Sequence, residues 1–427
     1  MRGWTTKTLG ELCDAGGGLV QTGPFGSQLH ESDYSETGTP VVMPKDIISG
    51  GIDHFGIARV SEAHVERLRR HKLLEGDIVY GRRGDIGRHA LIKGTTVGWL
   101  CGSGCLRINV GKSAVIPEFL NLYLQLPEVI RWIEGQAIGA TMPNLNSSIL
   151  RRTPVTFPTD PTTQRKIAAV LSAYDELIEN NKRRIALLEK MAEEIYREWF
   201  VRLRFPGHEK VKFTKGIPQG WTVQRLGDFA KEIKKGIKKK DLPDDMKYIG
   251  LEHISRKSIS IKDCSTCDTV DSNKLFFQER DILFGKIRPY LHKIGFAHFS
   301  GACSSDTIVL RPTERYYEGY LLLTVFSDAF VELASVASKG TKMPRADWDF
   351  LKKLELSVPV KKLLEQYQVH FEAIFSQIRN LLESNQILLK TRDLLLPRLI
   401  SGKLSVENLD IQFPPGMMEE MKEESGS

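Results

Sequence analysis

Two stretches of the chain place apolar residues at alternating steps of three and four. The first runs from Gln164 to Phe200 and the second from Tyr367 to Leu399. Such heptad spacing predicts long helices with narrow apolar stripes, which suit a helical partner better than a broad core. We therefore predict that the two helices pair as an antiparallel coiled coil. The predicted pairing positions are Leu171, Tyr174, Ile178, Ile185, Leu188 and Ile195 in the first helix, and Phe371, Ile374, Ile378, Leu381, Leu388 and Leu395 in the second.

Polar residues and prolines modify this pattern. Asn181 and Asn385 stand within the apolar stripes and are predicted to fix the register at some cost in stability. The first helix would be roughly 55 Å long at about 1.5 Å per residue, and Pro206-Gly207 is predicted to end it. Pro397 is predicted to stop or kink the second helix near Leu396. The alternative is that each helix covers only its own globular domain.

The segments outside the helices form an internal repeat. Trp4–Glu11 recurs as Trp221–Asp228, and Gly76–Arg82 recurs as Arg280–Lys286. Met142-Pro143 recurs as Met343-Pro344, and Val155–Pro158 as Leu356–Pro359. The matches keep their order while the offset drifts from 217 to 201 residues, which indicates a duplication whose halves have gained and lost loop residues.

Each copy mixes short apolar runs typical of strands with longer helical runs, which predicts an α+β fold. The predicted fold class is therefore two pseudo-symmetric α+β domains joined by two long helices. The predicted parts are a first domain at 1–160, a helical spacer at 161–206, a second domain at 207–360, a second spacer at 361–404 and an acidic, disordered tail at 405–427.

Charge and composition narrow the class of protein. The net charge is +7, but residues 405–427 carry −5, so the first 404 residues carry +12. A basic body favours a polyanionic partner, usually nucleic acid. The chain contains no apolar run of about 18 residues, so no membrane-spanning helix is predicted. Its first residues lack the apolar stretch of a signal peptide. Six cysteines are too few for a disulfide scaffold, and the short spacings at Cys101/Cys105 and Cys264/Cys267 fit reduced thiols better than a zinc site. We therefore predict an intracellular protein without a metal site.

Lysines and arginines in glycine-broken loops are the candidate DNA contacts, because they can reach phosphates, and arginine can also pair with guanine. The alternative is a solvated charged surface. Gln28 and Asn144 are weaker candidates. The candidates are Arg69, Arg70, Lys72, Arg82, Arg83, Arg88, Lys234, Lys235, Lys238, Lys239, Lys240, Lys286, Arg288, Lys342 and Arg345.

Several motifs together resemble the specificity subunits of type I restriction-modification systems. Both halves open with Trp, four residues, Leu, Gly and an acid. Gly26–His30, Gly38–Asp46, Gly76–Gly87 and Leu396–Leu404 add to the resemblance, which covers nearly the whole chain. The resemblance implies that each domain is a target-recognition domain that reads one half of a bipartite, asymmetric site on double-stranded DNA. The helices would fix the gap between the halves.

The same resemblance implies a non-catalytic subunit in the cytoplasm of a prokaryote. Two methyltransferase subunits would dock on it, and two restriction or motor subunits would join for cleavage. S-adenosylmethionine would bind in the methyltransferase, for adenine N6 methylation, and ATP and Mg in the motor subunit. The chain itself would carry no cofactor and no catalytic residue.

The sequence offers no motif for catalysis. There is no G-x-x-x-x-G-K loop followed by Ser or Thr, and Gly81, Gly84 and Gly87 have the wrong spacing for a dinucleotide loop. No Asn-Pro-Pro-Tyr type tetrapeptide of an amino-methyltransferase is present. Two other hypotheses remain: a fused enzyme with its own methyltransferase or nuclease site, and a helical adaptor that reads no sequence.

Overall fold

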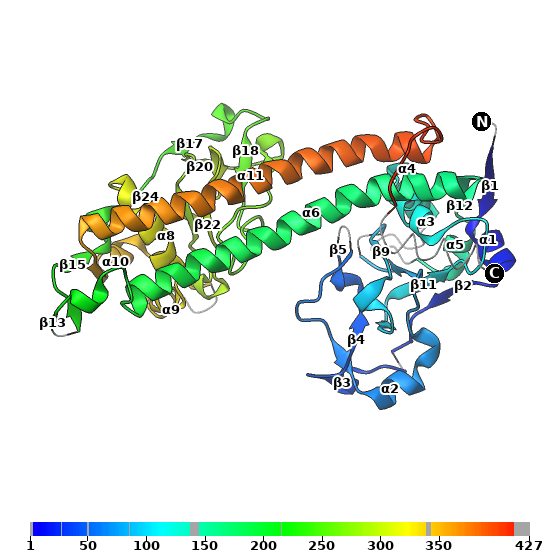
Figure 1. Cartoon of the computed structure of the whole chain (residues 1–427), viewed down its shortest axis with the longest axis horizontal. Coiled ribbons are helices and arrows are strands. Elements are labelled where there is room, and N and C mark those ends of the chain that lie inside the picture. The colour runs from blue at the N-terminus through cyan, green and yellow to red at the C-terminus, as the bar shows by residue number, and fades with distance from the viewer. Residues whose placement is uncertain are drawn as a thin grey trace. The chain divides into compact units, whose positions relative to one another are not determined.

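The computed structural model describes residues 3–26, 28–48, 51–84, 86–136, 145–214, 216–338 and 343–413 (Figure 1). The chain forms two compact units. Unit 1 combines Met1–Ile178 with Leu388–Ser427, and unit 2 is Glu179–Ile387. Each unit therefore takes a part of both long helices. The domain boundaries read from the sequence stay a prediction, and most of the acidic tail lies outside the described residues.

The two long helices are α6 (Pro161–Tyr196) and α11 (Lys361–Ile400). In unit 1, the start of α6 and the end of α11 share one buried cluster, with Ile167 beside Leu399 in it. In unit 2, the end of α6 packs on the start of α11, and the ring centroids of Trp199 and Tyr367 are 5.7 Å apart. The helices thus run in opposite directions (Figure 1), which confirms the predicted antiparallel coiled coil.

The asparagines of the two apolar stripes meet in unit 2. Asn181 Nδ2 donates a hydrogen bond to Asn385 Oδ1 over 2.9 Å, and both residues are buried. A buried amide costs free energy unless a partner satisfies it, so this pair favours the one register that brings the two amides together.

The ends of the helices differ in part from the prediction. After Tyr196 the chain makes a π-helical turn, Arg197–Val201, in which Arg202 N donates to Arg197 O. The wider turn lets the neighbours Trp199 and Phe200 both contact Tyr367.

The predicted stop of the second helix near Leu396 is wrong, because α11 continues past Pro397 to Ile400. The alternative, a kink at this proline, stays a prediction. Proline removes only one backbone donor so close to the helix end. Leu399 and Ile400 are buried in unit 1, and their burial stabilises the last turn.

Unit 1 contains short helices and several small sheets. Its helices are α1 (Leu9–Gly16), α2 (Glu62–Arg67), α3 (Pro117–Tyr123), α4 (Pro127–Gln136) and α5 (Ser147–Arg151). Its strands form the sheets β1 (Trp4–Thr8) with β12 (Pro154–Pro158); β2 (Leu19–Thr22), β11 (Cys105–Asn109), β8 (Ile78–Gly81) and β9 (His89–Leu91); β10 (Leu100–Cys101), β4 (Thr39–Val42), β7 (Arg59–Val60) and β3 (Tyr34–Ser35); and β5 (Ile47–Ile48) with β6 (Gly51–Ile52).

Unit 2 repeats this plan with changes in the third sheet. Its helices are α7 (Leu226–Phe229), α8 (Glu318–Phe326), α9 (Asp328–Val336) and α10 (Trp348–Leu351). Its strands form the sheets β15 (Thr222–Arg225) with β25 (Glu355–Val358); β16 (Ala230–Glu232), β24 (Thr307–Pro312), β21 (Ile282–Gly285) and β22 (Ile294–Phe296); β17 (Gly236–Ile237), β20 (Lys274–Phe277), β23 (Gly301–Cys303), β18 (Lys247–Ile249) and β19 (Ser265–Thr266); and β13 (Phe213–Thr214) with β14 (Ile217–Pro218).

The duplication extends to the ion pairs of two buried aspartates. Asp77, before β8, accepts from Arg107 Nε at 2.6 Å, and Asp281, before β21, accepts from Arg311 Nε at 2.7 Å. Each aspartate also accepts from the backbone N–H three residues earlier, at 2.6 and 2.7 Å. A buried carboxylate is stable only when it is paired and hydrogen-bonded in this way. The two units therefore share a polar frame as well as a strand order.

No single helix in the described part of the chain is long and apolar enough to cross a membrane. The bent pair Arg315–Phe326 and Asp328–Val336 passes that test only when taken together. Every residue of α8 within this pair is buried in unit 2, so its apolar character serves the core of that unit.

Candidate nucleic-acid interface

The hairpin loops after β8 and β21 are held by the same three backbone hydrogen bonds. In unit 1, Gly81 N donates to Arg88 O at 2.8 Å, Arg82 N to Gly104 O at 2.8 Å, and Leu145 N to Arg82 O at 3.0 Å.

In unit 2, Gly285 N donates to Lys293 O at 2.9 Å, Lys286 N to Asp306 O at 2.8 Å, and Ala346 N to Lys286 O at 2.9 Å. Three segments therefore meet at one place in each unit. We call this surface the hairpin face. It comprises 82–84, 86–88, 102–104 and 145–146 in unit 1, and 286–293, 304–306 and 343–346 in unit 2.

On the hairpin face of unit 1, the three candidate arginines differ. Arg82 is half-buried and its Nε donates to Leu145 O at 2.8 Å, so its side chain ties two segments of the face together. Arg83 and Arg88 are exposed. The weaker candidate Asn144 and the repeated pair Met142-Pro143 lie outside the described residues.

On the hairpin face of unit 2, Lys286 Nζ donates to Ser305 O at 3.3 Å, and Arg345 pairs with Asp306 at 3.4 Å. Arg288 is exposed. Tyr290 lies two residues further on and is 57% exposed. Lys342 lies outside the described residues.

Tyr290 was not among the candidate DNA contacts, because the sequence does not show that the strand before it ends in a tight turn. The one available signal was its place between Arg288 and His292, directly after Pro289.

The lysine run near β17 is only partly available for a partner. Lys234 pairs with Glu232 at 2.9 Å, the ammonium of Lys235 lies 4.5 Å from the ring centroid of Phe276, and Lys239 pairs with Asp271 at 3.2 Å. Lys238 and Lys240 are exposed. The run therefore includes a fixed part and two lysines able to reach phosphates.

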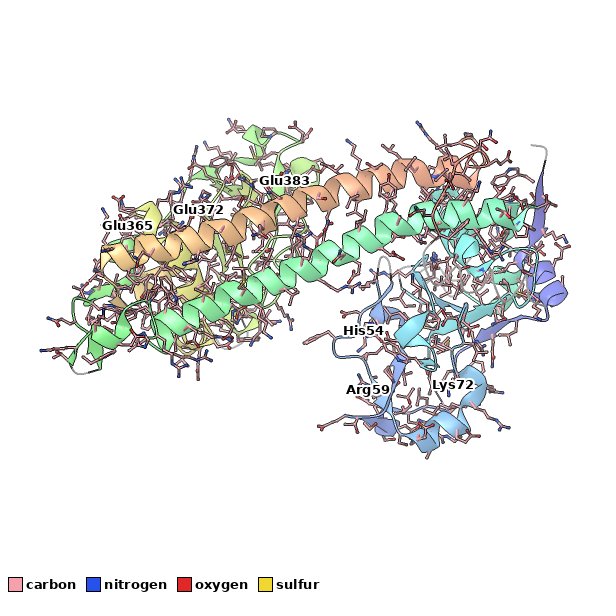
Figure 2. All side chains as sticks on the ribbon, viewed as in Figure 1. His54, Arg59, Lys72, Glu365, Glu372 and Glu383 are labelled. Atoms are coloured by element: carbon pink, nitrogen blue, oxygen red, sulfur yellow. The ribbon has the colours of Figure 1, made fainter. Side chains whose placement is uncertain are left out.

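The remaining candidates follow α2 in unit 1. Arg69 pairs with Glu66 at 3.4 Å, and Arg70 Nε donates to His71 Nε2 at 3.0 Å. Burial, together with the charge of Arg70, lowers the pKa of His71 to about 4, so its ring is a neutral acceptor at pH 7. Lys72 is exposed, and Figure 2 shows it in the same part of unit 1 as Arg59.

The described residues offer no cluster for metal-dependent chemistry. No group of three or more His, Cys, Asp or Glu side chains in those ranges could hold a metal ion. The cysteines are free thiols, and burial raises the pKa of Cys303 to about 12, which leaves that thiol unreactive at pH 7.

The strongest group of ionised side chains is structural. Arg280 pairs with Glu318 and Glu372, and Arg315 also pairs with Glu372, so these charges tie α8 to α11 within unit 2 (Glu372 is labelled in Figure 2).

The long helices also expose apolar side chains away from their shared stripe. Leu187 and Met191 on α6 are exposed, as is Val369 on α11, all in unit 2. In unit 1, Leu177 on α6 and Leu389 and Leu394 on α11 are exposed. Leu187 and Met191 lie four residues apart on one face of α6, and neighbouring exposed apolar residues favour contact with another protein.

Two units that share a four-stranded sheet, backbone hydrogen bonds and aspartate–arginine pairs but carry different loops, together with two paired helices, form the architecture of a two-domain specificity subunit. The chain belongs to the type I restriction modification DNA specificity domain family, whose model matches residues 1–190 and 218–390. It is thus a type I restriction-modification specificity subunit with two target-recognition domains, one in each unit.

Relatives of full length support this assignment. The type I restriction enzyme MjaIX specificity subunit of Methanocaldococcus jannaschii is 25% identical over 426 residues, which cover 95% of this chain and 94% of that protein. The HindI specificity subunit of Haemophilus influenzae is 19% identical over 84% of this chain and 93% of that protein. The crystal structure of a type I S subunit from M. genitalium shares the fold, with a TM-score of 0.57 at 17% identity over 93% of this chain and 96% of that chain.

Proposed function

We propose that each target-recognition domain reads one half of a bipartite, asymmetric site on double-stranded DNA, and that the paired helices fix the gap between the halves. The observation that carries this proposal is the hairpin face, where equivalent backbone bonds hold loops of different chemistry. A common frame lets both domains approach DNA in the same way, and different side chains let each domain recognise its own DNA sequence. Because the two faces differ, the site is not a palindrome.

The contacts divide by chemistry. Exposed lysines such as Lys238 and Lys240 are suited to phosphates, which position the domain without reading sequence. Arg83 and Arg88 in the first domain, and Arg288 in the second, are exposed arginines on the hairpin face, suited to guanine edges. The side chain of Arg82 holds the face together.

The chain itself catalyses nothing in this proposal. Two methyltransferase subunits dock on the helices and methylate adenine N6 with S-adenosylmethionine. Two motor subunits join them for ATP- and Mg-dependent cleavage, in the cytoplasm of a prokaryotic cell. The purified chain alone is expected to transfer no methyl group to DNA.

Methylation mapping tests the reading of sequence. The chain is co-expressed with the methyltransferase encoded beside it, and N6-methyladenine is mapped in the host DNA by single-molecule sequencing. The expected result is a split, asymmetric motif with a constant gap. Replacing residues 1–160 by the matching segment of a relative should change one half only, and replacing 207–360 should change the other. A continuous or palindromic motif would contradict the proposal, and no methylation by an intact complex would favour the adaptor hypothesis.

The proposed docking of the methyltransferase subunits on the long helices is tested by substitutions on α6. Leu187→Glu with Met191→Glu places charge on the exposed apolar patch of unit 2, because both side chains are exposed and lie four residues apart on α6. Co-purification with the methyltransferase should fall about tenfold, as expected when charge replaces apolar contact in an interface core. Lys182→Glu is the matched control, because this exposed residue of the same helix lies about 140° around the helix from Leu187. Unchanged co-purification would place the docking surface elsewhere.

A further inference from the structure

The loop between β21 and β22 has an unusual backbone. Arg288 and His292 have φ angles of 50° and 53°, in the left-handed region that residues with a side chain rarely adopt. They flank a one-turn 3-10 helix, Pro289–Leu291. In the first domain, Gly84 stands at the matching distance, three residues after the paired glycine, with a φ of 82°. Glycine adopts this conformation without strain, whereas the second domain has arginine in the same place.

Several contacts hold this strained loop in place. Leu291 N donates to Arg288 O, and His292 N donates to Pro289 O, both at 2.8 Å. Arg288 N donates to Pro344 O at 2.8 Å, which joins the loop to another segment of the hairpin face.

The His292 side chain anchors the other end of the loop. It is buried, with its Nε2 2.7 Å from Phe326 O and its ring centroid 4.6 Å from that of Phe326. A backbone fixed at both ends presents its outward side chains in one orientation.

The outward side chains are those of Arg288 and Tyr290. Pro289 is buried beneath them, while Tyr290 is 57% exposed. Among the residues that the structure describes, neither side chain has a hydrogen bond or ion pair. Lys286, from a neighbouring segment of the same face, adds positive charge, whereas the charge of Arg345 is paired with that of Asp306. An exposed aromatic ring among cations suits DNA, whose phosphates attract the cations and whose bases offer flat apolar and polar edges.

We propose that Arg288 and Tyr290 are specificity-determining residues, which contact base edges in the half-site bound by the second domain. The inference rests on the proposed function and deepens it. Phosphates are contacted equally well by flexible lysines, so a clamped and strained loop is needed only where geometry decides, as at a base edge. Lys286, whose ammonium donates to the neutral Ser305 O, then contacts the phosphates beside it.

The test uses the complex with the methyltransferase and the same methylation map. Tyr290→Ala and Arg288→Lys should each relax one or two base positions in one half of the motif by about tenfold. The other half should be unchanged. Arg288→Lys keeps the charge but loses the planar fork that pairs with guanine, and Tyr290→Phe separates the hydroxyl from the ring. Phe213→Ala, at another exposed aromatic of unit 2 on β13, is the control and should leave the motif intact.

The outcomes separate the two proposals. An unchanged motif in both Tyr290→Ala and Arg288→Lys, or an equal loss of methylation at every site, would overturn the inference and leave the proposed function standing. Lack of a bipartite motif with the unaltered chain would instead overturn the proposed function. Thermal unfolding of each purified complex identifies a folding defect. If Tyr290→Ala is unstable, Tyr290→Phe tests the hydroxyl and Tyr290→Leu tests the ring, and an unchanged motif in both would overturn the role of Tyr290.

Discussion

The two target-recognition domains place different loops on equivalent frames. In the first domain, the loop after β8 turns at Gly84 and Gly87, and it exposes Arg83 and Arg88. In the second, the loop after β21 is one residue longer and turns at left-handed Arg288 and His292. Below both loops the backbone bonds and the aspartate–arginine pair are the same. Since the frame does not depend on the loop above it, loop chemistry can change without loss of the fold.

The loops after β2 in unit 1 and after β16 in unit 2 also differ, although these strands hold equivalent places in their sheets. The loop after β2 exposes Phe25, whereas the loop after β16 carries the lysine run that begins at Lys234. The second domain therefore carries a lysine run where the first domain exposes a phenylalanine. If each domain binds DNA as proposed, phosphate contacts at this loop are expected in the second domain and not in the first.

The largest expected effect is the loss of stability when one of the two buried aspartates is replaced by alanine, and this loss should differ between the domains. Asp77→Ala leaves Arg107, whose side chain is 8% exposed, without its charge partner, and it removes the acceptor of Leu74 N–H and of Asn109 Nδ2. Breaking such a buried pair costs about 3–5 kcal/mol. Asp281→Ala leaves Arg311, whose side chain is 37% exposed and stays hydrated, so we expect about 1–3 kcal/mol.

Hydrogen exchange measured by mass spectrometry checks this prediction, because it reports each domain separately in a chain that need not unfold in one step. Asp77→Asn, which keeps an acceptor oxygen in place, should lose less protection than Asp77→Ala. Equal losses in Asp77→Ala and Asp281→Ala would show that the exposure of the arginine does not set the cost.

The asparagine pair allows a second comparison, between α6 and α11. The same antiparallel register places Asn181 opposite Asn385 and Ile185 opposite Leu381, all buried in unit 2. Asn181→Leu leaves the Asn385 amide buried without its partner, at a cost of about 1–3 kcal/mol. The double change Asn181→Leu with Asn385→Leu removes both amides and should unfold at a temperature equal to or above that of the unaltered chain.

The double variant should also lose the preference for pairing α6 with α11 of the same chain over pairing with a second copy. If α6 paired with α6 of a second copy in the same register, Asn181 would face Ile185, which leaves a buried amide unsatisfied; α11 paired with itself would place Asn385 against Leu381. The asparagines therefore favour pairing within one chain. Size-exclusion chromatography with light scattering should show more dimer for the double variant after refolding, and none of this shift for the exposed change Lys182→Leu on the same helix.

Much of the fold was predictable because its signals are periodic or repeated. The heptad spacing gave both helices and their pairing, and the ordered matches gave the duplication. What failed depended on tertiary contacts. Pro397 lies inside α11 because Leu399 and Ile400 are buried against unit 1, which a local rule on proline does not take into account. The π turn at Trp199 likewise follows from the packing of two adjacent aromatic rings on Tyr367.

The candidate interface was less predictable than the fold. Basic residues were easy to find, but the sequence does not tell a surface cation from one that holds the frame. Arg82 and Lys239 looked equivalent to Arg83 and Lys238, yet Arg82 bonds to Leu145 O and Lys239 pairs with Asp271. Tyr290 was overlooked because its exposure depends on left-handed residues at Arg288 and His292, and a left-handed arginine has no sequence signal.

The smallest expected effects are opposite changes in domain stability when Gly84 and Arg288, at the matching loop positions, are replaced. Gly84→Ala should destabilise the first domain by about 1 kcal/mol, because an L-residue is strained at a φ of 82° although no atom lies within 4 Å of the added methyl group. Arg288→Gly should stabilise the second domain by up to about 1 kcal/mol, since the strain at φ 50° disappears, less the entropy that glycine adds to the unfolded chain. The same variant should lose selectivity in one half of the methylation motif. Hydrogen exchange of the two loops measures the stabilities. A destabilised loop in Arg288→Gly would mean that the arginine side chain supports the fold, and its proposed role at the DNA would then lose its physical basis.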